Sequence, residues 1–322
     1  MLTELMEIMG SAHAGTGAHG AVKRMRMWPA VMLSVLLAAA LGGVGCGRHG
    51  SAAGSAEPGH PHVLRIGVCP GPYGRMVEEA LAPVLMRQQI RVEVVSFTDY
   101  LQPDIALDSG MIDANLMQHQ RYLDGIVREQ GFGLAAVISV PTLGMGVFSQ
   151  RYRALKELRA GDTIALPRDH VNQERALRLA ASLGMLTLPE SDGSGRLATV
   201  QDIADNRYGA EYVPLPSHKL AESLLSHAVA FVPGNYAVAA ALDYSTALGV
   251  EELQEEFKNV IAVRKDDLQT LGEVLREAVR SDEFRAAIDG HAFYSGFSRP
   301  QWWTEAAPGM PCHAPSCSAA AQ

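Results

Sequence analysis

Short apolar runs rich in β-branched residues alternate along the chain with longer stretches of helical periodicity. Helical patterns are clear around residues 75–87 and from Pro103, near a helix start, to Gly110 at its close. The apolar runs predict strands at 64–68, 92–95, 134–138, 144–148, 163–166, 212–214, 229–232 and 260–263. This alternation is typical of α/β proteins with parallel sheets.

A stretch marked by proline and glycine, VPTLGMGVFSQ at 140–150, interrupts this alternation near the middle of the chain. It predicts a crossover between two lobes. Ligands of open α/β sheets gather at the carboxyl ends of strands, where loops and helix N-termini converge. The predicted fold class is therefore α/β, with two lobes and a ligand cleft between them.

The N-terminal part has the architecture of an export signal. Lys23, Arg24 and Arg26 precede an apolar run, 27–41, which ends in small residues and is short for a membrane span. We therefore predict a signal over 1–45, with Met25 as an alternative start. A Gly/Ser/Ala/Pro-rich linker, 46–62, follows it.

Cys46 closes the signal and comes directly after Gly43-Val44-Gly45. This resembles the bacterial lipobox, whose cysteine is lipidated, although no large aliphatic residue stands three places before Cys46. The alternative is an ordinary cleaved signal that happens to end near a cysteine. Both interpretations place the mature chain outside the cytoplasm.

Composition narrows the function further. The chain has 322 residues, 48% of them hydrophobic and 19% charged, with a net charge of -8. These values fit an ordinary globular protein, and the chain has no long Lys/Arg cluster, so we predict no nucleic-acid partner. The segment 304–322 is rich in small residues and proline and predicts a loose tail.

The cysteines fit an oxidising compartment. Cys312 and Cys317 lie close enough in sequence to close a small disulfide loop, and the alternative is a metal site that adds His313. Cys69 is interpreted as a small buried residue.

The sequence carries no catalytic constellation. GxSxG, HExxH and Walker motifs are all missing, and the histidines lack metal-site spacing, so we predict no enzyme, no cofactor and no metal. The stretch RIGVCPGPYGRM predicts a strand, a Gly/Pro loop and a helix. It either brings bare backbone close to a ligand or forms a tight turn.

Three aromatic or imidazole side chains lie near predicted element ends: Tyr100, His119 and Tyr122. Together they could wall an apolar pocket with polar tips. The alternative is that Tyr122 packs in the core and His119 lies at the surface.

Arg175 stands out in the stretch PRDHVNQERALRL. Asn172 is a good helix N-cap, which puts Arg175 in the first turn, where the helix dipole disfavours a cation. The helical wheel places Arg175 on the polar face and not in the core. It is either a solvated arginine neutralised by Glu174 or Asp169, or part of a carboxylate or phosphate site.

Several motifs occur together, in order and at suitable spacing: PGPYGRM, FTDYLQPDIAL, IDANLMQHQRYLD, NQERALRL, TVQDIADN, GNYA and NVIAVRKDD. They resemble the NlpA/MetQ family, the lipoprotein substrate-binding components of methionine ABC importers, over residues 63–303. The resemblance implies a type II periplasmic-binding-protein fold. One lobe would comprise 63–151 and 249–303, and the other 152–248.

The resemblance also implies a ligand site. Tyr100, His119 and Tyr122 match pocket positions that enclose the ligand side chain. Asn172 and Arg175 match positions that hold the amino-acid backbone, with Arg175 on the carboxylate. Met117, which replaces a family phenylalanine, and Asn235, the remaining asparagine of an Asn-Gly-Asn-Tyr motif, complete the predicted ligand-binding set.

Two further departures from the family bear on the ligand. Tyr73 replaces a frequent histidine, and Pro233 replaces the first asparagine of Asn-Gly-Asn-Tyr. Proline offers neither an amide side chain nor an N–H, which removes or reroutes one ligand hydrogen bond.

The function implied is capture of methionine or a close analogue. A binding protein anchored to the membrane by a lipid on Cys46 would deliver it to an ABC permease and its ATPase. The alternatives are a binding protein for another apolar amino acid or a short peptide, an exported enzyme on this scaffold, and a structural lipoprotein with a vestigial cleft.

Overall fold

The computed structural model describes residues 62–190 and 195–304. The predicted export signal, Cys46 and the linker up to residue 61 lie outside the described residues, as does the predicted tail from residue 305, with Cys312 and Cys317.

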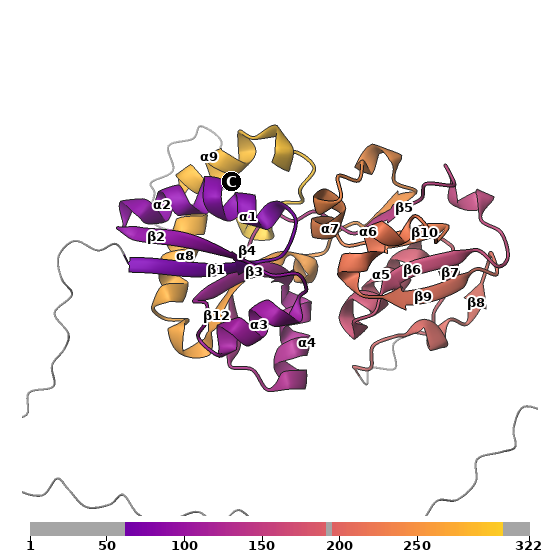
Figure 1. Ribbon diagram of the computed structural model, residues 1–322, viewed down its shortest axis with the longest axis horizontal. Coiled ribbons are helices and arrows are strands. Elements are labelled where there is room, and N and C mark those ends of the chain that lie inside the picture. The colour runs from indigo at the N-terminus through magenta and orange to yellow at the C-terminus, as the bar shows by residue number, and fades with distance from the viewer. Residues whose placement is uncertain (1–61, 191–194, 305–322) are drawn as a thin grey trace, which may run out of the picture. The chain divides into compact units, whose positions relative to one another are not determined.

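Five strands form the first sheet, in the order β2-β1-β3-β12-β4 (Figure 1). Strand β1 pairs in parallel with β2 and β3, whereas β12 runs antiparallel to β3 and β4. The strands are β1 (His62–Val68), β2 (Ile90–Ser96), β3 (Ala114–His119), β4 (Leu134–Ser139) and β12 (Asn259–Arg264).

The second sheet has the order β11-β5-β10-β6-β9. Strands β10, β6 and β9 are parallel, and β5 runs antiparallel to β10 and β11. The strands are β5 (Gly146–Phe148), β6 (Thr163–Pro167), β9 (Glu211–Leu215), β10 (Val229–Val232) and β11 (Gly249–Val250). Two short strands, β7 (Leu186–Thr187) and β8 (Asp205–Asn206), pair with each other.

The helices connect these strands. The helices that pack against the first sheet are α1 (Pro72–Met76), α2 (Ala82–Arg87), α3 (Leu101–Asp108), α4 (Gln120–Gln130), α8 (Leu271–Arg280) and α9 (Asp282–Asp289). A π-helical segment, Val77–Leu81, joins α1 to α2. Around the second sheet lie α5 (His170–Ser182), α6 (Leu220–Ser223) and α7 (Gly234–Ala239).

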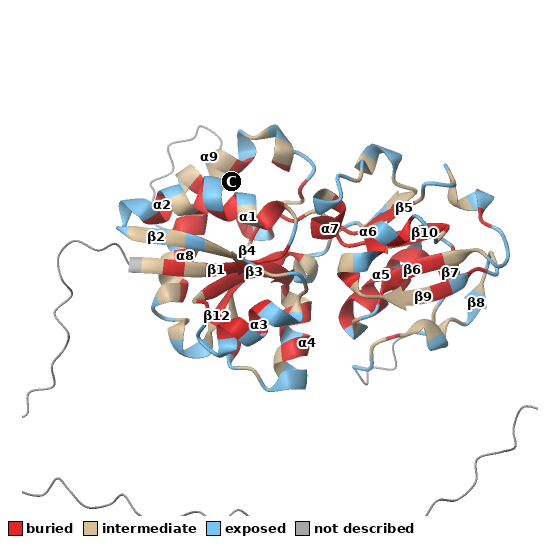
Figure 2. Cartoon of the chain, in the orientation of Figure 1, coloured by how far each residue is buried: buried red, intermediate tan, exposed pale blue. Residues whose placement is uncertain are grey.

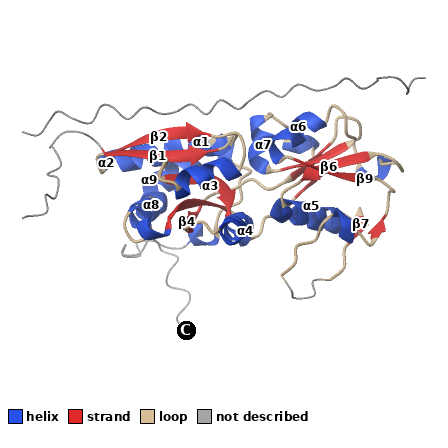
Figure 3. Ribbon diagram, turned by 60° about the horizontal axis from the view of Figure 1, so that its bottom comes forward, coloured by secondary structure: helices blue, strands red, loops and turns tan. Residues whose placement is uncertain are grey.

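Alternate residues along the strands of the second sheet pack into two separate hydrophobic cores, one on each face of the sheet. In β10, Val229 and Phe231 pack with residues of α5, and Ala230 and Val232 pack with residues of α6 and α7. Successive strand side chains point to opposite faces, so a strand buried on both faces reads as one continuous apolar run. Figure 3 shows α5 on one side of β6 and α6 and α7 on the other.

The first sheet is covered in the same way. Apolar residues of α1, α2, α8 and α9 pack into one core with Leu64 and Ile66 of β1. Residues of α3 and α4 form another core with Val260 and Ala262 of β12. Figure 2 shows the burial concentrated in the strands and the inner helix faces.

The chain passes from the first sheet to the second between β4 and β5 and returns between β11 and β12. These are the two crossovers of a two-lobed α/β fold, which confirms the predicted fold class. The predicted boundaries at 151 and 249 would assign β5 and β11 to the first lobe, yet both belong to the second sheet. We therefore propose that both strands belong to the second lobe, because their backbone hydrogen bonds are made there.

All the predicted strands are present, and four of the described strands were not predicted: β3 and the two-residue strands β7, β8 and β11. Strand β3 is fully buried but carries Asn115, Gln118 and His119, so it lacks the apolar run that marks the others. Two helix starts also differ from the prediction. The first helical region begins at Pro72, and α3 begins at Leu101, two residues before Pro103.

Candidate functional site

A small cavity lies among elements of both lobes. It is lined by all the residues of the predicted ligand-binding set: Tyr100, Met117, His119, Tyr122, Asn172, Arg175 and Asn235. The space between them is about 20 Å³, which suits a water molecule and not an amino acid. A larger ligand therefore needs the lining elements to move apart.

Further side chains complete the lining and include the two positions that depart from the family. They are Tyr73, Gln118, Thr142, Leu143, Pro233, Gly234 and Asn259. Gln118, Thr142 and Asn259 were missed as site residues. Gln118 and Asn259 stand inside the motifs IDANLMQHQRYLD and NVIAVRKDD, so the motifs themselves were the available signal.

Hydrogen bonds join the two lobes beside the cavity. The Tyr100 hydroxyl donates to Asn235 Oδ1 at 2.6 Å, and Asn235 Nδ2 donates to the Pro70 carbonyl at 3.1 Å. The Tyr100 ring packs edge-on against Tyr122 with ring centroids 5.6 Å apart. The ring also lies against Tyr236 of the other lobe, with centroids 5.2 Å apart. Tyr100 therefore contacts side chains of both lobes.

Two glycines allow close backbone approaches, one between the lobes and one between the second lobe and the crossover that joins β4 to β5. Gly71 has φ 129°, and a Cβ there would lie 2.4 Å from the Asn235 carbonyl oxygen. A Cβ at Gly234 would lie 2.2 Å from the Leu143 carbonyl oxygen. The loop of RIGVCPGPYGRM thus packs bare backbone against the other lobe.

His119 is buried, 4% exposed, and not a surface histidine. It is the N-cap of α4, where its Nδ1 accepts from the Tyr122 backbone N–H at 3.1 Å. The ring hydrogen is then on Nε2, which lies 3.0 Å from Asn172 Oδ1 and donates to it. Burial, and next the charge of Arg175, lower the pKa of His119 from 6.5 to about 3, so the ring is neutral near neutral pH.

The predicted capping role of Asn172 is wrong. The N-cap of α5 is Asp169, whose Oδ1 accepts from the Asn172 backbone N–H at 2.9 Å and from its Nδ2 at 3.0 Å. Asp169 is as good a capping residue and has extended backbone, so the helix begins earlier. The side-chain oxygen of Asn172, Oδ1, instead lies within hydrogen-bond distance of His119 Nε2 and Arg175 Nη1.

Of the two alternatives for Arg175, the solvated arginine at the surface is wrong. Arg175 lies in the second turn of α5 and is 7% exposed. Its ion-pair partner is neither Glu174 nor Asp169 but Glu251, with Nε 2.7 Å from Oε1 and Nη2 2.6 Å from Oε2. Burial lowers the pKa of Arg175, and the Glu251 carboxylate outweighs this effect and raises it.

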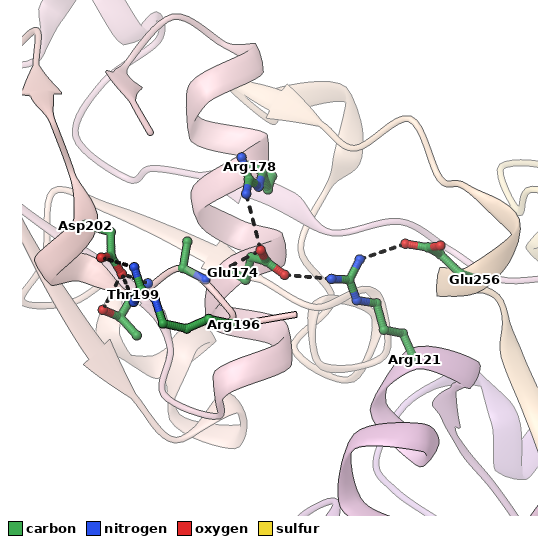
Figure 4. A network of polar contacts seen from close by, with 8 residues as sticks. Arg121, Glu174, Arg178, Arg196, Thr199, Asp202 and Glu256 are labelled. Carbon is green, nitrogen blue, oxygen red and sulfur yellow. Dashed lines mark hydrogen bonds and ion pairs between the residues drawn. The ribbon is translucent and has the colours of Figure 1, made fainter. Parts of the chain in front are cut away.

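Glu174 belongs to a separate polar network that joins the lobes (Figure 4). Its carboxylate pairs with Arg121 of α4 at 2.8 Å and with Arg178 at 3.4 Å. Arg121 also pairs with Glu256 of the returning crossover at 2.8 Å. The polar face of α5 is therefore covered by another element, which the helical wheel alone does not reveal.

The model of a family described as NlpA lipoprotein matches residues 64–302, nearly all of the described chain. The chain belongs to the NlpA lipoprotein family. Its relatives include D-methionine-binding lipoproteins MetQ. The MetQ of Yersinia pestis is 32% identical over 73% of this chain and 88% of the relative, and that of Escherichia coli K12 is 31% identical over 76% and 89%.

Solved structures resemble this NlpA-family chain over the same region. A nutrient binding protein from Burkholderia cenocepacia bound to methionine has a TM-score of 0.69 and 33% identity, covering 73% of this chain and 99% of that one. The substrate binding protein of a methionine transporter from Streptococcus pneumoniae has a TM-score of 0.68 and 26% identity, covering 74% and 96%. In the residues that the structure describes, no helix of the NlpA-family chain is both long and apolar enough to cross a membrane.

Behind the cavity, this NlpA-family protein buries an acidic side chain. Asp104 Oδ1 accepts from Gln118 Nε2 at 2.6 Å and from Asn115 Nδ2 at 2.9 Å. Within the described residues, neither Asp104 Oδ2 nor Gln118 Oε1 has a hydrogen-bond partner. Burial raises the pKa of Asp104 from 3.8 to about 7, against the lowering effect of the two amide hydrogen bonds.

The variant Asp104→Asn of this NlpA-family chain should therefore change how stability depends on pH. A raised pKa adds stability at low pH that is lost as the pH rises toward 7, and asparagine cannot ionise. From about pH 5.5 to about pH 8, wild type should lose about 2 kcal/mol relative to Asp104→Asn. Urea unfolding at both pH values measures this. The exposed Asp124→Asn is the control, and a difference that does not vary with pH would contradict the prediction.

Proposed function

We propose that this NlpA-family protein is the substrate-binding lipoprotein of an ABC importer. It captures methionine or a close analogue and delivers it to a membrane permease driven by a cytoplasmic ATPase. The chain performs no covalent chemistry. A lipid on Cys46 would anchor it to a bacterial membrane, facing the periplasm or the exterior.

The charge of the cavity carries this proposal. Among the described residues that line it, Arg175 is the one with a permanent charge, and its neighbours include Tyr100, Met117 and Tyr122. A buried guanidinium favours a carboxylate, and an apolar wall favours an apolar side chain. An α-amino acid with an apolar side chain has both features, which agrees with the methionine named for the relatives.

Ligand capture would be coupled to lobe movement. The small cavity implies that the lobes separate to admit an amino acid and close again over it. The hydrogen bonds from Tyr100 to Asn235 and from His119 to Asn172 join the lobes across this space, so they would open when the ligand enters. The closed form is then the state that the permease distinguishes from the empty one.

Pro233 supports a second candidate, a binding protein for another apolar amino acid or a short methionine-containing peptide. Pro233 lines the cavity and caps α7, yet it has no N–H and no side-chain amide to offer. A missing hydrogen bond to a buried polar group costs about 1–3 kcal/mol, enough to redirect binding without abolishing it.

Isothermal calorimetry against an amino-acid panel tests the proposal. Methionine should give saturable heat. No heat with methionine, at protein concentrations well above micromolar, would exclude methionine as the ligand, and heat with another panel member would favour the second candidate. Turnover of a substrate that disappears on changing His119 would instead favour an exported enzyme.

The anchor has its own test. Mass spectrometry of the mature N-terminus should find a lipidated Cys46. An unmodified N-terminus at another residue would favour the ordinary cleaved signal and a protein that is not tethered through this cysteine.

A further inference from the structure

The guanidinium of Arg175 has two edges, and the structure uses them differently. Nε and Nη2 form the side edge, which binds both oxygens of Glu251 at 2.7 Å and 2.6 Å. The end edge, formed by Nη1 and Nη2, makes one longer contact in the described part of the chain, 3.3 Å from Nη1 to Asn172 Oδ1. A planar guanidinium can bind one carboxylate on each edge.

Glu251 lines a groove beside the cavity and not the cavity itself. The groove has a volume of about 760 Å³, and Arg175 lines both the groove and the cavity. The side edge thus faces the groove, and the end edge is left for the cavity. Glu251 is not in the place that a ligand carboxylate would take.

Glu251 belongs to the crossover between β11 and β12, and hydrogen bonds tie it to the other crossover at Met145. Glu251 Oε2 accepts from the Met145 backbone N–H at 2.9 Å, and the Glu251 N–H donates to the Met145 carbonyl at 2.9 Å. A Cβ at Gly144 would lie 2.9 Å from the Glu251 carbonyl oxygen, so the glycine is needed for this close approach. The Phe257 ring lies beneath the guanidinium, with its centroid 5.0 Å from Arg175 Cζ.

We propose that Glu251 is the positioning residue that holds the end edge of Arg175 toward the ligand carboxylate. The inference rests on the proposed function, since it needs a ligand with a carboxylate. The fixed ion pair compensates the buried charge before the ligand arrives and leaves the guanidinium in one orientation. Because Glu251 bridges the two crossovers, Arg175 is aligned with the segments about which the lobes move.

The test compares two ligands, methionine and methionine amide, which lacks the carboxylate. In Glu251→Gln one hydrogen bond to Arg175 is lost, because an amide has one acceptor oxygen and its NH₂ faces an N–H. Calorimetry should show that methionine binding weakens by about tenfold or more, as expected for a lost charge-assisted hydrogen bond. Methionine amide binding should change by less than about twofold. Glu252→Gln removes the same charge from the exposed neighbouring residue and should change neither.

The other outcomes are distinct. An equal loss for both ligands would mean that Glu251 only supports the fold, and a gain in methionine affinity would make it a competitor of the ligand. Either result overturns the inference and leaves the proposed function standing. If the wild-type protein binds no methionine, the proposed function fails, and this inference fails with it.

A second measurement uses wild-type protein and does not depend on whether Glu251→Gln folds. In ¹⁵N-arginine NMR spectra, the Nε–H of Arg175 should give a protected resonance that stays in place when methionine is added, while the Nη resonances shift. A large shift of Nε–H on binding would mean that the ligand displaces Glu251 and would overturn the inference.

Discussion

Replacement of Arg175 by alanine is expected to weaken methionine binding by at least tenfold, or about 1.4 kcal/mol. The end edge of this buried guanidinium is the cationic donor in the cavity, so its removal leaves the ligand carboxylate desolvated and unpaired. Calorimetry of both proteins measures the difference. An unchanged affinity would exclude Arg175 as the carboxylate site, whereas no binding by either protein would favour a vestigial cleft.

Two further variants separate binding from folding. The alanine variant also leaves Glu251 buried without its partner, which should lower the free energy of unfolding by about 3 kcal/mol. Arg175→Lys keeps the charge but not the planar pair of edges, so it should bind weakly while losing less stability. Arg178→Ala removes the same charge from the next turn of α5, where the side chain is 45% exposed, and should leave binding unchanged.

Acid should destabilise this protein through His119 by about 3 kcal/mol between about pH 7 and about pH 4. In the unfolded chain the imidazole takes up a proton below about pH 6.5, whereas the buried ring in the folded protein stays neutral until about pH 3. The unfolded state therefore binds more protons as the pH falls, and the folded state loses stability.

His119→Asn isolates this effect. Asparagine can still cap α4 but cannot titrate, so the stability of wild type relative to His119→Asn should fall by that amount over the same pH range. Chemical unfolding at several pH values gives the difference, in which the opposite contribution of Asp104 cancels. His170→Asn, which removes an exposed imidazole, is the control. A difference independent of pH would mean that His119 titrates in the folded state as it does in the unfolded chain.

The strands that could be predicted are those whose burial is apolar on both faces. In β10, every residue is buried and apolar, so the run Val229–Val232 is visible in the sequence. Strand β3 was not predicted, because its buried positions carry Asn115, Gln118 and His119, which bind Asp104 and Asn172. The part of the sheet that builds the candidate site is the part that departs from the apolar pattern.

Local sequence determined the α/β character of this protein, most of its strands and, through motifs in register, the residues that line the cavity. The tertiary structure decided which of their groups are engaged. Arg175 and Glu251 are 76 residues apart, and Arg121 and Glu174 are 53 apart. A helical wheel finds a polar face, but only the packing of a distant crossover against that face makes it a buried ion pair, because burial and charge pairing depend on neighbours in space.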